Sequence, residues 1–292
     1  FDARAAQLVR AADKAARLIR SAVKRALFAR PADARGDFSI LADRFWRDLK
    51  PALPAEKLRE ATAAYLSYLT DRHYYLSLKG MGVSDRVPLR LKLLDLYVPL
   101  KARMELPEGD TWNRTLSLAG RDITDDQQEL LHFGEPVPLL QVLQKHSGVI
   151  VLGDPGAGKT TFVKHLALRL ARGEGLKIGL DDYLPILLPL AAFANAIQTH
   201  NIRLDDFIAE YFAGIGSDLP VGPMLSEALK AGRALILLDG LDEVRDINMR
   251  NTVVERVVDF FAFHRRVGNK FVLTSRVVGY RAVRPSAEDL VE

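Results

Sequence analysis

One glycine-rich segment carries the residue types that bind a chain of phosphates. Residues 153–160 read GDPGAGKT and match the phosphate-loop pattern GxxxxGK[ST] at every fixed position. Glycines let successive backbone N–H groups turn toward one anion, and the positive end of the following helix points at the same place. Lys159 is expected to bridge the β- and γ-phosphates, and the Thr160 hydroxyl to ligate Mg²⁺. The predicted nucleotide-binding residues are Gly153, Asp154, Pro155, Gly156, Ala157, Gly158, Lys159, Thr160 and Thr161.

A second segment places carboxylates directly after an apolar run. Residues 234–243 read ALILLDGLDE, so Asp239 is expected to emerge from the end of a buried strand. A carboxylate at that edge of a sheet can hold Mg²⁺, directly or through water, which makes Thr160 and Asp239 the predicted metal ligands. Gly240 leaves room beside the phosphates. Asp242 and Glu243 are candidates to orient or deprotonate a water molecule.

Both motifs lie in a part of the chain where apolar strands alternate with helices. We predict strands at 148–152, 184–190, 234–238 and 270–274. Predicted helices cover 139–146, the stretch from the phosphate loop to 171, 204–213, 222–231 and 248–267. Apolar strands alternating with helices indicate a parallel sheet buried on both faces. The predicted fold class is therefore α/β, a three-layer P-loop NTPase sandwich, preceded by a mostly helical N-terminal region.

The N-terminal region differs from the rest of the chain in its charge and in its predicted secondary structure. Residues 1–30 hold eight basic and two acidic residues, a net charge of +6, while the whole chain carries +4. Residues 3–29 predict a basic amphipathic helix packed on its apolar stripe, with an anionic membrane or nucleic acid as alternative partners. A second helix is predicted at 55–78, and an extended stretch follows with a short strand at 94–100. Residues 105–137 are turn-rich, so we divide the chain into a helical region, 1–110, and a nucleotide-binding domain, 111–292.

The two motifs together resemble the NACHT family within the STAND class of P-loop ATPases. The resemblance rests on GDPGAGKTT and LILLDGLDE, with a small residue after Asp239 and a further acidic pair. Residues 271–276, FVLTSR, look like the sensor 1 strand of that family. This implies that Arg276 lies near the γ-phosphate and distinguishes ATP from ADP, and that Asp242, Glu243 and Arg276 serve catalysis. Residues 95–103 resemble the segment that precedes NACHT modules in bacterial multidomain proteins. In such proteins, residues just upstream of the phosphate loop often help to enclose the adenine, and Val149 or its neighbours are candidates that the sequence does not separate.

The resemblance implies a slowly hydrolysing signalling ATPase, in which ATP favours an open, homo-oligomerising state and ADP a closed one. Prokaryotic defence signalling is the implied role. The sequence begins with Phe1 and stops shortly after Arg276, so we expect a piece of a longer protein. Its lid and its parts for sensing a ligand or effector would lie elsewhere. The alternative is an assembly scaffold that holds nucleotide as a structural ligand, which a missing lid favours and the acidic pair disfavours.

Composition excludes several other classes of protein. The chain has no cysteine, which excludes disulfides and thiolate sites and favours a cytoplasmic location. No apolar run reaches the roughly 20 residues of a transmembrane helix. Residues 269–272 read NKFV, which does not fit the guanine-reading NKxD motif of a GTPase, so ATP or ADP is the expected nucleotide. Nucleic-acid binding is not indicated, because the basic helix lacks interleaved aromatic residues.

Overall fold

The computed structural model describes residues 37–76, 91–102, 136–181, 183–215, 218–277, 280, 283 and 290–291. Three features predicted from the sequence lie wholly or mostly outside these residues. They are the basic helix at 3–29, the turn-rich stretch at 105–137 and the domain boundary near residue 110. All three stay predictions.

A five-stranded parallel sheet forms the centre of the described part. Its strands lie in the spatial order β4-β5-β6-β3-β7. β6 lies between β3, which leads into the phosphate loop, and β5, which ends at Asp239. A strand is thus inserted between the two strands that carry the phosphate loop and Asp239. The strands are β3 (Gly148–Leu152), β4 (Leu184–Pro189), β5 (Ala234–Asp239), β6 (Lys270–Ser275) and β7 (Leu290–Val291).

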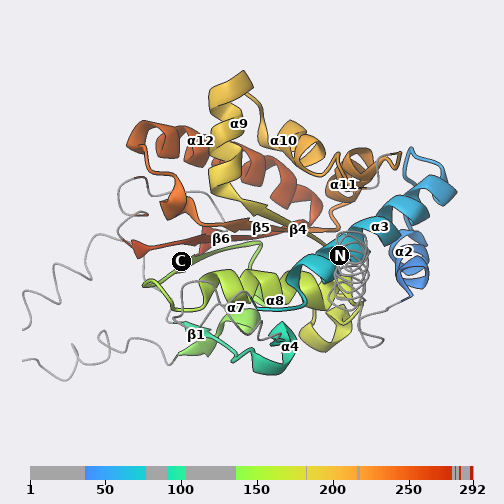
Figure 1. The fold of residues 1–292 in the computed structure, drawn as a ribbon, viewed down its shortest axis with the longest axis horizontal. Helices are drawn as coiled ribbons and strands as arrows, with labels where there is room; N and C mark the ends of the chain where they lie inside the picture. The colour runs from blue at the N-terminus through green and yellow to red at the C-terminus, as the bar shows by residue number, and fades with distance from the viewer. Residues whose placement is uncertain are drawn as a thin grey trace, which may run out of the picture. The chain divides into compact units, whose positions relative to one another are not determined.

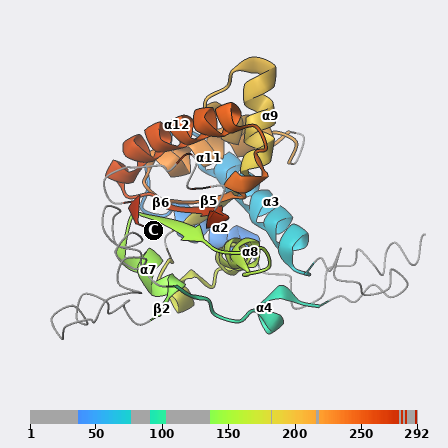
Figure 2. The ribbon, with the colours of Figure 1, turned by 90° about the vertical axis from the view of Figure 1, so that its left-hand side faces the viewer.

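Helices cover both faces of this sheet and complete a three-layer sandwich (Figures 1 and 2). The helices of one face are α7 (Leu139–Lys145) and α8 (Lys159–Ala171). Those of the other face are α9 (Leu190–His200), α10 (Leu204–Tyr211), α11 (Val221–Lys230) and α12 (Ile247–His264). The predicted α/β P-loop NTPase fold is confirmed. Among the described helices, none combines the length and apolar composition needed to span a membrane.

The strands are apolar along their whole length because their side chains pack into two hydrophobic cores, one on each face of the sheet. On β5, Ile236 and Leu238 pack into the core under α9–α12, while Leu235 and Leu237 pack into the core under α7 and α8. Side chains along a strand point alternately to the two faces, so a sheet covered on both faces needs apolar residues at every position. Each of these four side chains is almost fully buried.

The helices before the phosphate loop share one of these cores. Helices α2 (Phe38–Trp46) and α3 (Ala55–His73) pack on each other, and the apolar side of α3 joins the core under α9–α12. The fully buried Tyr65 donates a hydrogen bond from its hydroxyl to the carbonyl of Pro185 on β4, at 2.7 Å. Because β4 is the end strand of the sheet, Tyr65 satisfies a carbonyl on its open side.

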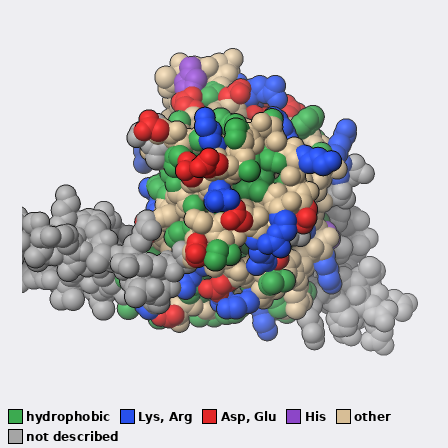
Figure 3. Space-filling model, turned by 90° about the vertical axis from the view of Figure 1, so that its right-hand side faces the viewer, with side chains coloured by type: hydrophobic (Ala, Val, Ile, Leu, Met, Phe, Trp, Pro, Cys, Tyr) green, Lys and Arg blue, Asp and Glu red, His purple; other side chains and the backbone are tan. Residues whose placement is uncertain are grey.

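On the face that carries α2 and α3, Lys and Arg side chains are interspersed with Asp and Glu side chains (Figure 3). Arg59 and Asp43 form one such pair, at 2.6 Å between the Arg59 Nε and the Asp43 Oδ1 atoms. Helix α3 ends at His73, five residues before the predicted end at 78.

Two local predictions differ from the structure. The strand predicted at 94–100 is wrong, because Leu93–Leu96 form a helical turn, α4, with Leu93 buried and Leu96 exposed. The chain then runs extended into β1 (Lys101–Ala102), which pairs antiparallel with β2 (Val137–Pro138). Helix α9 was not predicted, because it starts directly after Pro189 and continues the apolar run of β4 without a loop.

Asn269 and Lys270 hold the edge of the sheet that lies opposite the phosphate loop. The buried Asn269 accepts the Ala234 N–H at 2.9 Å and donates to the carbonyls of Leu229 and His264 at 2.8 and 3.0 Å. The Lys270 ammonium donates to three carbonyls at the end of α7, within 2.8–3.1 Å. Both side chains are therefore engaged in hydrogen bonds that hold the fold together. This agrees with the mismatch of residues 269–272 to the guanine-reading NKxD motif.

This arrangement predicts that Asn269→Ala costs at least about 2 kcal/mol of unfolding free energy, because it leaves buried backbone groups without partners. Urea denaturation followed by circular dichroism measures the loss. The matched control is Asn248→Ala at an exposed position of α12, with an expected change within about 0.5 kcal/mol. Equal losses in the two variants would contradict the role of Asn269.

Candidate functional site

The carboxyl ends of three neighbouring strands place the candidate site at one edge of the sheet. Leu152 on β3 lies opposite Ser275 on β6, and Leu238 on β5 lies opposite Leu273 on β6. The segments that follow these strands therefore start side by side. Ligands of open α/β sheets bind at such carboxyl ends.

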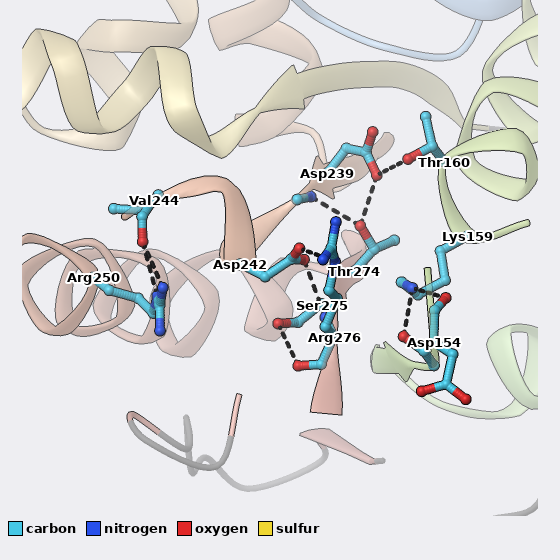
Figure 4. Close-up of polar contacts among 12 residues, drawn as sticks. Asp154, Lys159, Thr160, Asp239, Asp242, Val244, Arg250, Thr274, Ser275 and Arg276 are labelled. Carbon is cyan, nitrogen blue, oxygen red and sulfur yellow. Dashed lines mark hydrogen bonds and ion pairs between the residues drawn. The ribbon is translucent and has the colours of Figure 1, made fainter. Parts of the chain in front are cut away.

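The phosphate loop, residues 153–160, is shaped by two glycines and by its own lysine. Gly156 and Gly158 have φ angles of 81° and 85°, a region that residues with a Cβ atom rarely adopt. Gly158 is the N-cap of α8, so the helix starts at the loop. The Lys159 ammonium turns back over the loop and donates to the carbonyls of Gly153 and Asp154, at 2.6 and 2.9 Å (Figure 4). A cation and a helix N-terminus thus converge on one small space.

One oxygen of Asp239 joins the loop to two strands of the sheet (Figure 4). Asp239 Oδ1 accepts a hydrogen bond from the Thr160 hydroxyl at 3.1 Å and another from the Thr274 hydroxyl at 2.6 Å. The Thr274 hydroxyl in turn accepts the Gly240 N–H at 2.9 Å. The two predicted metal ligands, Thr160 and Asp239, are therefore in direct contact although 79 residues separate them.

Asp242 and Arg276 form an ion pair in the segments that follow Asp239 and Thr274. The Arg276 Nε lies 2.8 Å from Asp242 Oδ2, and the Arg276 backbone N–H donates to Asp242 Oδ1 at 3.0 Å. Both carboxylate oxygens are occupied by the same arginine, so Asp242 orients Arg276. The Arg276 side chain remains 55 % exposed, which leaves its other nitrogens accessible to a ligand.

Glu243 has a different setting from Asp242. It lines a cleft of about 440 Å³ together with Thr160 and Asp239. Burial raises the pKa of the Glu243 carboxyl, and the negative charges of Asp239 and Asp242 raise it further. The turn that brings Glu243 here requires Gly240, which has a φ of 79° and whose added Cβ would lie 2.9 Å from Glu243 Cδ. A carboxylate with a raised pKa is suited to accept a proton.

A comparison with known protein families matches residues 147–292 to the NACHT domain, which is half of the chain. This chain belongs to the NACHT family. A comparison with curated protein sequences found no match. The NACHT match starts just before β3 and includes the phosphate loop, Asp239 and Arg276. The chain is therefore a nucleotide-binding P-loop NTPase.

The donor set of the NACHT domain fits magnesium when it is bound together with nucleotide. Thr160 and Asp239 present a hydroxyl and a carboxylate oxygen in contact, and oxygen is the ligand that Mg²⁺ prefers. No group of three or more His, Cys, Asp or Glu side chains that could hold a metal occurs among the described residues. The remaining ligands would thus come from phosphate oxygens and water, as is usual for Mg²⁺ at phosphate sites.

Sequence reasoning missed two residues that support the site. Thr274 was assigned only to a strand, and only the strand pairing shows that it lies beside Asp239. Arg250 donates from Nε and Nη2 to the Val244 carbonyl, at 3.0 and 2.7 Å (Figure 4), and holds the turn after Glu243. Neither residue has a sequence signal of its own, because both act through contacts between distant segments.

Thr274→Val tests whether Asp239 depends on its buried partner. Valine keeps the shape of threonine but removes the hydroxyl, so Asp239 loses its shortest hydrogen bond and the Gly240 N–H loses its acceptor. We expect Mg²⁺ to support ATP binding about 10- to 100-fold less well, as for other partners of metal ligands. Mg²⁺ titrations with a fluorescent ATP analogue measure this. Thr252→Val on α12 is the control, and an equal effect there would contradict the role of Thr274.

The raised pKa of Glu243 predicts the pH dependence of nucleotide hydrolysis. A general base must be ionised, and a raised pKa means that Glu243 takes up its proton at a higher pH than an ordinary glutamate, whose pKa is 4.5. The hydrolysis rate should therefore fall as the pH is lowered, and the midpoint of this fall should lie above pH 4.5. Initial rates measured across the acidic range should show this fall in the parent protein and lose it in Glu243→Gln. A fall at the same pH in both proteins would rule out Glu243 as its source.

Proposed function

We propose that this NACHT domain is an ATP-dependent signalling switch, in which the bound nucleotide controls homo-oligomerisation. The observation that carries the proposal is the contact of Thr160 and Thr274 with Asp239. It connects the phosphate loop to the two strand ends that carry the acidic pair and Arg276. A change at the phosphates can thereby reach several elements of the fold.

In this proposal ATP binds through its phosphates at residues 153–161. The Lys159 ammonium exchanges its carbonyl partners for phosphate oxygens, and the N-terminus of α8 adds a favourable dipole. Thr160 and Asp239 would hold Mg²⁺, and the bound ion would supply positive charge beside the phosphates. The loop amides and Lys159 bind the phosphate chain of ADP as well.

Hydrolysis and switching use the acidic pair and Arg276. Glu243 accepts a proton from the attacking water, and Asp242 holds Arg276 toward the γ-phosphate. A ligand shifts a conformational equilibrium only through contacts that differ between the two states. The contact between Arg276 and the γ-phosphate exists with ATP and is lost with ADP, so it supplies such a difference.

The segment before the phosphate loop supports adenine as the base. Leu100 approaches the loop, since an added Cβ on Gly158 would lie 3.4 Å from Leu100 Cδ2. Tyr97 stacks on His165 of α8 with a ring distance of 3.7 Å. This segment therefore runs beside the start of α8, where it can form part of a pocket for a flat base. Asn269 and Lys270 are occupied elsewhere, so they do not read a guanine.

Membership of the NACHT family supports a proposal for the wider role. We place the protein in the cytoplasm, in signal transduction and in prokaryotic defence, with a ligand or effector acting through further domains. Assembly into a homo-oligomer is the expected output of the ATP state. Since the acidic pair lies intact at the site, we favour a switch over a scaffold that holds nucleotide without turnover.

Lys159→Ala tests nucleotide binding itself. Loss of the cation that faces the phosphates should weaken ATP and ADP binding by at least about 100-fold. Isothermal titration calorimetry measures both affinities. Lys145→Ala, an exposed lysine on α7, removes the same charge and should leave both unchanged. Unchanged ATP affinity in Lys159→Ala would overturn the assignment.

Glu243→Gln separates the switch from the scaffold. This variant should bind ATP normally, hydrolyse it at least about tenfold more slowly and accumulate in the ATP-dependent oligomer. Phosphate release and light scattering coupled to size exclusion measure turnover and assembly. Tight ATP binding by the parent protein without turnover or assembly would support the scaffold instead.

A further inference from the structure

The cleft beside Glu243 has lining residues that the proposed mechanism does not use. Thr160, Asp239 and Glu243 line it together with Lys164 of α8. The last two turns of α3 also line it and contribute Tyr68, Leu69, Arg72 and His73. Helix α3 also packs against α8, the helix that starts at the phosphate loop (Figure 2). A segment outside the matched NACHT region thus completes the surroundings of the metal-ligand pair.

Two cations, Lys164 and Arg72, line the same cleft as Asp239 and Glu243. Lys164 lies one helical turn after Thr160, so both side chains emerge from the same side of α8. The positive charge of Lys164 acts on the carboxyl of Glu243 and on the imidazole of His73, so Lys164 lies near both residues. In the described part of the chain, no hydrogen bond or ion pair occupies the Lys164 ammonium. Its charge is available to a ligand in the cleft.

Arg72 is the second cation and the one that α3 supplies. Its guanidinium lies 5.7 Å from the ring centre of Tyr68, one turn earlier on α3, and interacts with the Tyr68 hydroxyl, while Arg72 is exposed to solvent. The neighbouring His73 is buried and stays neutral at physiological pH, because burial and the charges of Lys164 and Arg72 lower its pKa to about 4. The cleft therefore contains one guanidinium and one ammonium in addition to the carboxylates of Asp239 and Glu243.

We propose that Arg72, supported by Lys164, contacts the terminal phosphate of a nucleoside triphosphate bound at the phosphate loop, so that α3 senses whether that phosphate is present. The inference rests on the proposed function. Thr160 and Asp239 would hold Mg²⁺, and the terminal phosphate lies next to this ion in P-loop enzymes. Thr160, Asp239 and Arg72 line the same cleft, so a terminal phosphate bound there would come near Arg72. The planar fork of a guanidinium matches phosphate oxygens, and ADP lacks the group that it would bind.

The contact would connect the nucleotide to the N-terminal region. Helix α3 is continuous for 19 residues, and Tyr65, two turns before Arg72, fixes it to β4. A phosphate that binds Arg72 therefore adds a contact near the C-terminal end of α3, where Tyr74 and Leu76 already pair with residues 91–93. Hydrogen exchange in residues 68–73 should be slower with a triphosphate than with ADP.

The decisive experiment compares the affinity for a non-hydrolysable ATP analogue with the affinity for ADP, both with Mg²⁺. Arg72→Ala should weaken analogue binding by about 10- to 100-fold and leave ADP binding unchanged. Arg72→Lys should fall in between, because it keeps the charge and loses the fork. Lys164→Ala should also lower the affinity for the ATP analogue relative to the affinity for ADP. Lys57→Ala, an exposed cation near the other end of α3, is the matched control and should leave both affinities unchanged.

An analogue-to-ADP ratio in Arg72→Ala equal to that of the parent protein would overturn the inference, whether both affinities stay or both fall together. Because Arg72 is exposed, the variant should unfold at the same temperature as the parent, and calorimetry checks this. A parent protein that binds neither nucleotide would instead overturn the proposed function, and with it the inference. If the parent protein binds both nucleotides and Arg72→Ala leaves the ratio of the two affinities unchanged, only the role of Arg72 is overturned and the proposed function stands.

Discussion

The Asp239 carboxylate, shared by the hydroxyls of Thr160 and Thr274, is the contact on which the site depends. It joins the start of α8, the end of β5 and the end of β6 through one oxygen atom. The parallel pairing of β3, β6 and β5 makes this possible, since it brings the three strand ends to one edge. A hydroxyl and a carboxylate held in contact present two oxygen atoms of the kind that a divalent ion prefers.

The rest of the fold keeps that edge in place from two directions. At the opposite edge, Asn269 and Lys270 tie the starts of β5 and β6 to the ends of neighbouring helices. On the side of β4, Tyr65 attaches α3 through a buried hydrogen bond. The N-terminal helices therefore belong to the same hydrophobic core as the sheet, although the family match begins only at residue 147. In our proposal, this shared core is the route by which the state of the phosphates influences the N-terminal region.

Much of this was predictable, because local patterns determine it. The apolar runs predicted β3–β6 to within a residue or so at each end, and the phosphate-loop pattern alone indicated the loop and Lys159. Helix α9 was missed because its apolar residues continue those of β4 without a turn. Thr274 and Arg72 were missed for another reason. Their roles arise from strand pairing and helix packing between distant segments, which leave no local spacing to detect.

The most direct test of the account is whether a divalent ion binds at Asp239 only together with nucleotide. Mn²⁺ can replace Mg²⁺ at oxygen ligands, and its electron paramagnetic resonance signal changes on binding. The account predicts an immobilised Mn²⁺ signal when protein, ATP and Mn²⁺ are mixed, and its loss when ATP is left out or when Asp239 is changed to Asn. An immobilised signal without ATP, or one unchanged in Asp239→Asn, would contradict the central role of Asp239.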